Sequence, residues 1–188
     1  MESQVIGKVV ALSGTATLEI DGKSIDLENG SPVFKGGVLK TGTDSHIEVR
    51  FADDTMLSQG SNSEVSIDNY VFDQPDSASS ILLNLTEGTL RTITGKIAEE
   101  NPEGFEVKSP LATLGIRGTD FSVIHVTDPD PKTDVVLNQI GENHILIVRD
   151  QYGNIRYQND PGTYVVVKAD EPISVVEVLS EEERKKVL

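Results

Sequence analysis

The sequence predicts an all-β protein, built as a layered antiparallel sandwich or a solenoid-like stack of short strands, with a short helix at its C-terminus. One observation is that apolar and polar residues alternate in short segments rich in β-branched side chains. The other is that turn residues separate these segments at intervals of about 8–12 residues, which is typical of sheets joined by tight turns. The predicted strands, in chain order, are residues 5–12, 15–20, 46–51, 64–72, 80–85, 121–126, 144–150, 163–168 and 173–178. The turn signals are Asp21-Gly22, Asn29-Gly30, Asp53-Asp54, Tyr152-Gly153-Asn154 and Asp160-Pro161-Gly162.

A faint internal echo accompanies these strands. The pattern Leu-x-x-Gly begins at Leu27, Leu57 and Leu85, at intervals of about 30 residues, and a looser copy begins at Tyr157. Such an echo fits supersecondary units that bury a face by stacking on a neighbour, but short glycine turns alone also produce it.

The segments between the strands divide the chain. Residues 94–104 are polar and contain a proline, so we expect a surface loop, and residues 127–134 form a second polar loop. We expect residues 1–126 to form the main β-domain, and residues 127–188 to add a loop, further strands of the same domain and the terminal helix. Ser180 and Glu183 have the spacing of a capping box at the start of that helix.

Composition excludes several classes of function. The 188 residues carry a net charge of −15, from 16 basic and 31 acidic side chains, so we expect no nucleic-acid partner and no insertion into a membrane. The chain has no cysteine, which excludes disulfides, thiol catalysis and cysteine-bound zinc. The N-terminus lacks the charged and apolar regions of a signal peptide, which leaves a trimmed signal, another export route or a cytosolic location open.

Three stretches carry a family resemblance: "GKVVALSGTATL" with the following "LENGSPVFKGGVLKTGTDSHIEVRFADDTMLSQGSNSEVSI", then "LTEGTLRTITG", and finally "VKSPLATLGIRGTDFSVI". They resemble the FecR-type domain, which is named for a periplasmic regulator of ferric-citrate uptake. The resemblance covers roughly residues 5–126 and implies a stand-alone periplasmic or extracellular module of a bacterium. A full FecR regulator also has a cytoplasmic anti-sigma segment and a membrane helix; this sequence has neither, so we do not expect a complete transmembrane regulator.

The opening residues 4–19 also resemble the N-terminal retention modules of type I-secreted adhesins. Those modules are cut at a dialanine by a periplasmic protease, and this sequence contains no Ala-Ala pair.

The segment "SPLATLGIRGTDF" holds the main candidate site. Gly115 and Gly118 flank Ile116-Arg117, and glycines at such positions permit a positive φ or the close approach of another backbone. Arg117 could pair with Asp120 or Glu87 as part of a structural hydrogen-bond cluster, or it could grip a ligand. We therefore name Arg117, Thr119 and Asp120 as the candidate residues for binding a ligand or partner.

Other chemistry is sparse. His46, His125 and His144 are scattered over strands, and no spacing brings them together as metal ligands. Asp53 and Asp54 are adjacent, so their side chains point to opposite faces, which does not suit paired acid–base catalysis.

Calcium is the most plausible metal, and Asp128, Asp130 and Asp134 are weak candidate ligands. The loop lacks the glycine and bidentate glutamate of a calcium-binding hand, so we expect no cofactor and no metal.

These observations predict a non-catalytic extracytoplasmic module that binds an envelope or surface protein, through sheet edges among other surfaces. A carbohydrate-binding or adhesin-anchoring module is the alternative. Sugar binding favours exposed aromatic residues, and Tyr70, Tyr152 and Tyr157 are the candidates, with Tyr70 in an apolar run.

Overall fold

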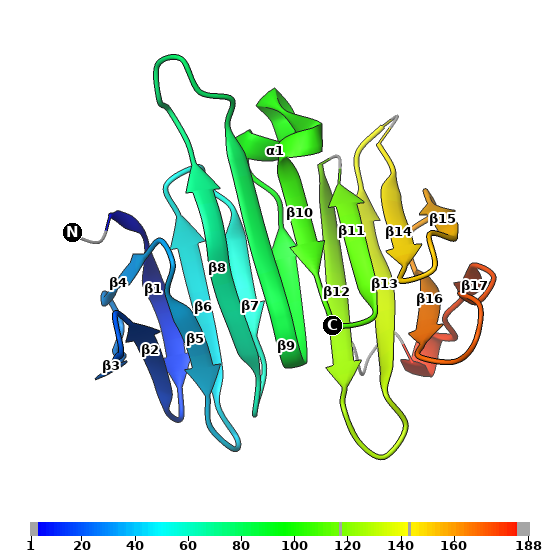
Figure 1. Ribbon diagram of the computed structural model, residues 1–188, viewed down its shortest axis with the longest axis horizontal. Coiled ribbons are helices and arrows are strands. Elements are labelled where there is room, and N and C mark those ends of the chain that lie inside the picture. Colours follow the sequence, from blue (N-terminus) through cyan, green and yellow to red (C-terminus); the bar gives the residue numbers. More distant parts are fainter. Residues whose placement is uncertain (1–3, 117, 143, 184–188) are drawn as a thin grey trace.

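The computed structural model describes residues 4–116, 118–142 and 144–183. It is an elongated sandwich of two sheets, with the N-terminal strands at one end and the last strands at the other (Figure 1). The all-β fold class is confirmed, and the sandwich form of the prediction is the correct one.

The first layer, sheet A, has the spatial order β4-β1-β6-β7-β9-β12-β13-β16-β17, and every pair in it is antiparallel. Its strands are β1 (Val5–Ser13), β4 (Pro32–Phe34), β6 (His46–Phe51), β7 (Met56–Gln59), β9 (Ser80–Ile93), β12 (Thr119–Val126), β13 (Lys132–Ile140), β16 (Thr163–Lys168) and β17 (Glu177–Val178).

The second layer, sheet B, has the order β3-β2-β5-β8-β9-β10-β11-β14-β15. Its further strands are β2 (Ala16–Ile20), β3 (Lys23–Asp26), β5 (Val38–Thr41), β8 (Glu64–Val71), β10 (Phe105–Lys108), β11 (Ala112–Ile116), β14 (Leu146–Asp150) and β15 (Ile155–Gln158). In the described part of the chain, β9 and β10 form the one parallel pair.

Strand β9 belongs to both sheets and joins them near the middle of the molecule (Figure 1). In its first half Ile81, Leu83 and Leu85 are buried, and in its second half Leu90 and Thr92 are buried. The buried positions thus change from odd to even numbers. When a strand passes from one sheet to the opposite one, the side chains that point into the core must come from its other face. A shift of one residue achieves this.

The shift occurs at Gly88, whose φ is +88°. Beside it, the N–H of Thr89 donates a hydrogen bond of 2.9 Å to Oγ of Ser63. A Cβ atom on Gly88 would lie 2.6 Å from Cα of Ser63, so only glycine fits this crossing without moving the neighbouring backbone.

A similar crossing joins β1 to β2. Gly14 has a φ of +77°, and the N–H of Thr15 donates 2.9 Å to Oγ of Ser45. The two crossings therefore share one structure: a glycine with positive φ is followed by a threonine whose N–H donates to the hydroxyl of a serine in another connection between the sheets.

The internal echo in the sequence marks such crossings. The glycines of its four copies, Gly30, Gly60, Gly88 and Gly162, all lie where the chain passes from one sheet to the other. A further copy, which begins at Leu39 and ends at Gly42, lies at the crossing from β5 to β6.

The core lies between the two sheets. Its largest fully buried side chains include Phe51, Phe105 and Phe121, each from a different part of the chain. Phe121 anchors β12 in the core.

The strand predictions were incomplete. Residues 46–51 and 163–168 coincide with β6 and β16, but eight strands were missed: β3, β4, β5, β7, β10, β11, β13 and β15. The expected strand at residues 173–178 is wrong over most of its length, because only Glu177 and Val178 pair with β16. Residues 132–134 were expected in a loop and instead begin β13.

The prediction of a surface loop at residues 94–104 is also wrong. This segment forms the helix α1 (Lys96–Glu100) and a 3-10 turn (Pro102–Gly104). Ile97 and Ala98 are buried, so α1 packs on the core. It lies at the rim of the sandwich, near β9 and β10 (Figure 1). Most residues of this segment are polar, so its composition did not indicate that Ile97 and Ala98 are buried.

The start of the C-terminal helix is confirmed. Residues 181–183 are helical, and residues 184–188 lie outside the described part of the chain. The predicted capping box is formed: the N–H of Glu183 donates 3.3 Å to Oγ of Ser180, and the N–H of Ser180 donates 2.9 Å to Oε2 of Glu183.

Candidate functional site

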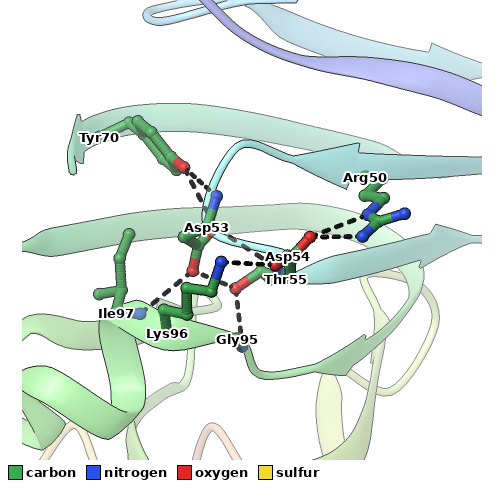
Figure 2. A network of polar contacts seen from close by, with 8 residues as sticks. All are labelled: Arg50, Asp53, Asp54, Thr55, Tyr70, Gly95, Lys96 and Ile97. Atoms are coloured by element: carbon green, nitrogen blue, oxygen red, sulfur yellow. Dashed lines mark hydrogen bonds and ion pairs between the residues drawn. The ribbon is translucent and has the colours of Figure 1, made fainter. Parts of the chain in front are cut away.

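The densest cluster of buried polar contacts surrounds Asp53, in the turn between β6 and β7 (Figure 2). Its carboxylate accepts 3.1 Å from the Tyr70 hydroxyl, 2.7 Å from the Thr55 hydroxyl and 3.3 Å from the N–H of Ile97. Its main-chain carbonyl accepts 2.8 Å from the N–H of Lys96. Asp53 therefore fastens the hairpin to β8 and to α1, and its side chain is completely buried.

The hydroxyls around Asp53 are engaged as well. Oγ1 of Thr55 accepts 3.0 Å from the N–H of Gly95, and the Tyr70 hydroxyl accepts 2.9 Å from the N–H of Asp53 (Figure 2). Burial, and then the charge of Asp53, raise the pKa of Tyr70 far above its usual value. The cluster is thus a closed structural network.

Asp54 points the other way, as expected for the neighbour of a buried residue. It forms ion pairs with Arg50, at 2.5 Å, and with Lys96, at 2.9 Å (Figure 2). Hydrogen bonds to Lys96 and then Arg50 lower the pKa of Asp54. The two adjacent aspartates do not converge on a common point, which agrees with the prediction that they are not a catalytic pair.

The second cluster contains Asp120, one of the predicted site residues. Its carboxylate accepts a bidentate pair from Arg91 of β9, at 3.0 and 2.7 Å, and 3.1 Å from the amide of Asn138 on β13. These hydrogen bonds to Asp120 raise the pKa of Arg91. Asp120 is buried and holds three neighbouring strands together.

A surface hollow of about 390 Å³ adjoins this cluster. Thr119 and Asp120 form part of its wall, together with Glu99 of α1, Gln139 of β13 and His144. Oγ1 of Thr119 is buried and, within the described residues, has no hydrogen-bond partner.

His144 closes one side of the hollow. Its Nδ1 lies 3.0 Å from the Gly118 carbonyl, a contact in which the ring nitrogen must donate. A Cβ atom on Gly118 or Gly141 would lie 2.5 or 2.6 Å from the ring, so both glycines make room for it.

The glycines of the candidate segment therefore differ. Gly118 has a φ of +52° and contacts His144, as the prediction requires. For Gly115 the prediction is wrong, because its φ is not positive and a Cβ there would meet no atom within 4 Å. Arg117 lies outside the described residues, and Thr119 and Asp120 lie together at the start of β12.

His125 and His46 lie away from this hollow. His125 is buried, and its Nδ1 lies 2.9 Å from Oγ1 of Thr133, whereas His46 is exposed and contacts Glu48. Burial lowers the pKa of His125, although Lys132 and Glu87 act in the opposite sense.

This shift predicts a pH-dependent stability. Because the folded state holds His125 with a lowered pKa, the unfolded state binds more protons once the pH falls below about 6.5. We expect the free energy of unfolding to fall between about pH 7.5 and pH 5.5, and His125→Gln to reduce that slope. Urea unfolding at several pH values measures it, and equal slopes for the two proteins would contradict the assignment.

The candidate calcium ligands lie on different elements, two in a loop and one on a strand. Asp128 and Asp130 lie in the loop that joins β12 to β13, whereas Asp134 lies on β13. Oδ2 of Asp134 is 2.7 Å from Nζ of Lys132. The described residues contain no group of three histidine or acidic side chains arranged for a metal ion. Nor does any described helix have the length and apolar character needed to cross a membrane.

Comparison with protein families identifies the chain. The model of the family described as "FecR protein" matches residues 37–140, which is just over half of the sequence. The chain belongs to the FecR family. The match includes the Asp53 network, the crossing at Gly88 and the residues Thr119 and Asp120, so the resemblance stated from the sequence is confirmed. A search among curated proteins finds no match.

Solved structures support the fold. Two crystal structures of a candidate anti-sigma factor from Parabacteroides distasonis ATCC 8503, at 1.65 and 2.50 Å resolution, resemble this FecR domain with a TM-score of 0.59 and 15% identity. The similarity covers 79% of this chain and 62% of that protein, so the chain spans less than two thirds of its length.

Sequence reasoning missed Arg91 and Asn138. Both contact Asp120 only because β9 and β13 lie on either side of β12. Arg91 is 29 residues before Asp120 in the chain, and nothing local signals such a pair. Its place in "LTEGTLRTITG", within one of the family-like stretches, was the only available hint.

Proposed function

We propose that this FecR domain is a non-catalytic binding module that contacts another protein in signalling or assembly at the bacterial cell envelope. Membership of the FecR family is the observation that carries this proposal. The similar fold of a candidate anti-sigma factor agrees with a regulatory role. The periplasm or the cell surface is the location that the family membership favours.

The state of the buried polar groups supports a non-catalytic role. The buried acidic and histidine side chains of the described residues are Asp53, Asp120, Asp150 and His125, and each forms hydrogen bonds with neighbouring residues. A catalytic group needs a free lone pair or proton directed at a substrate. Asp120 lies in the wall of the hollow, but its carboxylate is engaged by Arg91 and Asn138.

Arg117, Thr119 and Asp120 remain the candidate partner-binding residues in this proposal. Thr119 contributes the unpartnered hydroxyl beside the hollow, and Asp120 serves mainly to fix the strands around it. Arg117 adjoins them in the sequence.

Affinity capture from a native envelope extract tests the proposed function. We expect the wild-type domain to retain a specific protein, identified by mass spectrometry, and Arg117→Ala to retain less of it while remaining folded. Retention of polysaccharide alone would refute a protein-binding module.

Glycan binding is the second candidate, and the exposure of two tyrosines favours it. Tyr152 and Tyr157 are 62% and 56% exposed, whereas Tyr70 is buried and bound to Asp53. If glycan binding is the function, Tyr152→Ala and Tyr157→Ala should abolish retention of polysaccharide, because aromatic faces supply the contact with sugar rings.

A further inference from the structure

The four outer edges of the sandwich differ in their protection. An edge strand exposes unpaired main-chain groups, and proteins protect such edges with charge, proline, short length or a covering segment. At the N-terminal end, β4 is three residues long and contains Pro32, and β3 carries Lys23 and Asp26 with all four residues exposed. Both of these edges are therefore protected.

At the C-terminal end, side chains of β14 and β15 at the edge of sheet B bind the residues that follow β16. Nε and Nη2 of Arg156 on β15 donate 2.8 and 2.9 Å to the carbonyls of Ser174 and Ile173. The N–H of Ile173 also donates 3.4 Å to Asp150. Residues 173–174 are thus fastened along this edge.

The edge of sheet A at the same end has no covering segment among the described residues. Although β17 itself is only two residues long, the backbone lies along β16 from Ser174, whose N–H donates 3.0 Å to the Val166 carbonyl, to Leu179, whose N–H donates 2.8 Å to the Gly162 carbonyl. Glu177 and Val178 of β17 pair with Tyr164 and Thr163 of β16, and no described strand pairs with the other side of β17 (Figure 1). Val175, Val176 and Val178 are 67%, 37% and 70% exposed. We call these three residues the valine edge.

The composition of the valine edge is typical of a strand that has a neighbouring strand on each side. Valine is favoured in strands because its branched side chain packs against residues of an adjoining strand. Here three valines within four residues are exposed at a sheet edge with which no further described strand pairs. An added strand would bury them and complete the hydrogen-bond ladder of sheet A.

Charge decides what kind of strand fits. Residues 169–183 contain six acidic side chains and no basic one. Arg184, Lys185 and Lys186 follow outside the described residues, and the whole chain carries a charge of −15. A second copy of this chain would bring like charges together, whereas a basic segment would be attracted.

We propose that the valine edge binds an extended segment of a partner protein, one that alternates apolar residues and carries lysine or arginine at its ends. The segment adds to sheet A as a further strand beside β17. This inference rests on the proposed protein-binding function and adds to the candidate residues Thr119 and Asp120 a second contact surface, together with the chemistry of the partner.

Binding of a defined peptide tests the inference. The probe is a synthetic peptide of about six alternating valine and threonine residues between terminal lysines, with blocked ends. Amide shifts in nuclear magnetic resonance should move at residues 175–178 and not at β3. A peptide with glutamates in place of the lysines should bind at least about tenfold more weakly.

Two further comparisons separate strand addition from general attraction. Methylation of alternate main-chain nitrogens in the peptide should abolish binding, because it removes the ladder hydrogen bonds and leaves the side chains. Val178→Lys should weaken binding at least about tenfold, whereas Ile25→Lys on β3, an edge strand of sheet B at the N-terminal end, should not. Both residues are exposed, so both variants should fold.

Several results would overturn the inference: no binding of the lysine peptide, equal binding of the methylated peptide, or concentration-dependent dimerisation of this chain through the valine edge. The proposed function fails separately. If envelope capture still succeeds with Val178→Lys, the protein-binding role stands and the valine edge is the wrong surface.

Discussion

Asp53→Ala should destabilise the FecR domain by about 3 kcal/mol or more. The substitution leaves the Tyr70 hydroxyl, the Thr55 hydroxyl and the N–H of Ile97 without their acceptor in a site closed to water. Each buried donor left unpaired costs about 1–3 kcal/mol. Because Asp53 also fixes α1, we expect this helix to be the first part to lose protection from hydrogen exchange.

Asp54→Asn is the matched control, one residue along the chain, because asparagine tolerates the φ of +69° at this position. Within the described residues, the side chain of Asp54 forms ion pairs with Arg50 and Lys96 on the surface, and exposed ion pairs contribute little. Its stability should stay close to that of the wild type. Urea unfolding followed by circular dichroism measures both variants, and equal effects would show that the Asp53 network is not what holds the hairpin to α1.

Gly88→Ala should lower the free energy of unfolding by about 2–4 kcal/mol. The residue has a φ of +88°, and its new Cβ would lie 2.6 Å from Cα of Ser63. Both the backbone conformation and the contact oppose any side chain. Since β9 crosses between the sheets here, the strain falls where the two layers are joined.

Gly36→Ala separates these two causes. Gly36 has a φ of +79°, yet a Cβ there would meet no atom within 4 Å. It should therefore lose only the conformational part, about 1–2 kcal/mol. If both variants lose the same amount, the close contact with Ser63 contributes nothing and our account of the crossing is wrong.

The fold class could be predicted because strand alternation is a local signal. Residues 46–51 form β6 because their alternating apolar side chains have one face to bury. The Leu-x-x-Gly repeat could also be recognised in the sequence. That its glycines lie where the chain crosses between the sheets depends on contacts such as that of Gly88 with Ser63, which are distant in the sequence. Short exposed strands such as β3 carry no alternation of burial and gave no signal.

The candidate site was less accessible to sequence reasoning. The role of Thr119 and Asp120 in binding stays a prediction. The arginine that pairs with Asp120 in the described structure is Arg91, from a strand far away in the chain. The exposure of the valine edge could not be predicted from the sequence either. The alternation of residues 173–178 predicts a paired strand, and it is the missing neighbour that leaves these valines exposed.

Hydrogen exchange of the domain, alone and with the partner obtained by envelope capture, tests the central claim most directly. The claim is that this FecR domain binds a protein by adding a strand beside β17. It predicts that amide exchange at residues 175–178 slows when the partner binds, while exchange at β3 stays unchanged. Slowed exchange around Thr119 and the hollow, with residues 175–178 unaffected, would contradict it.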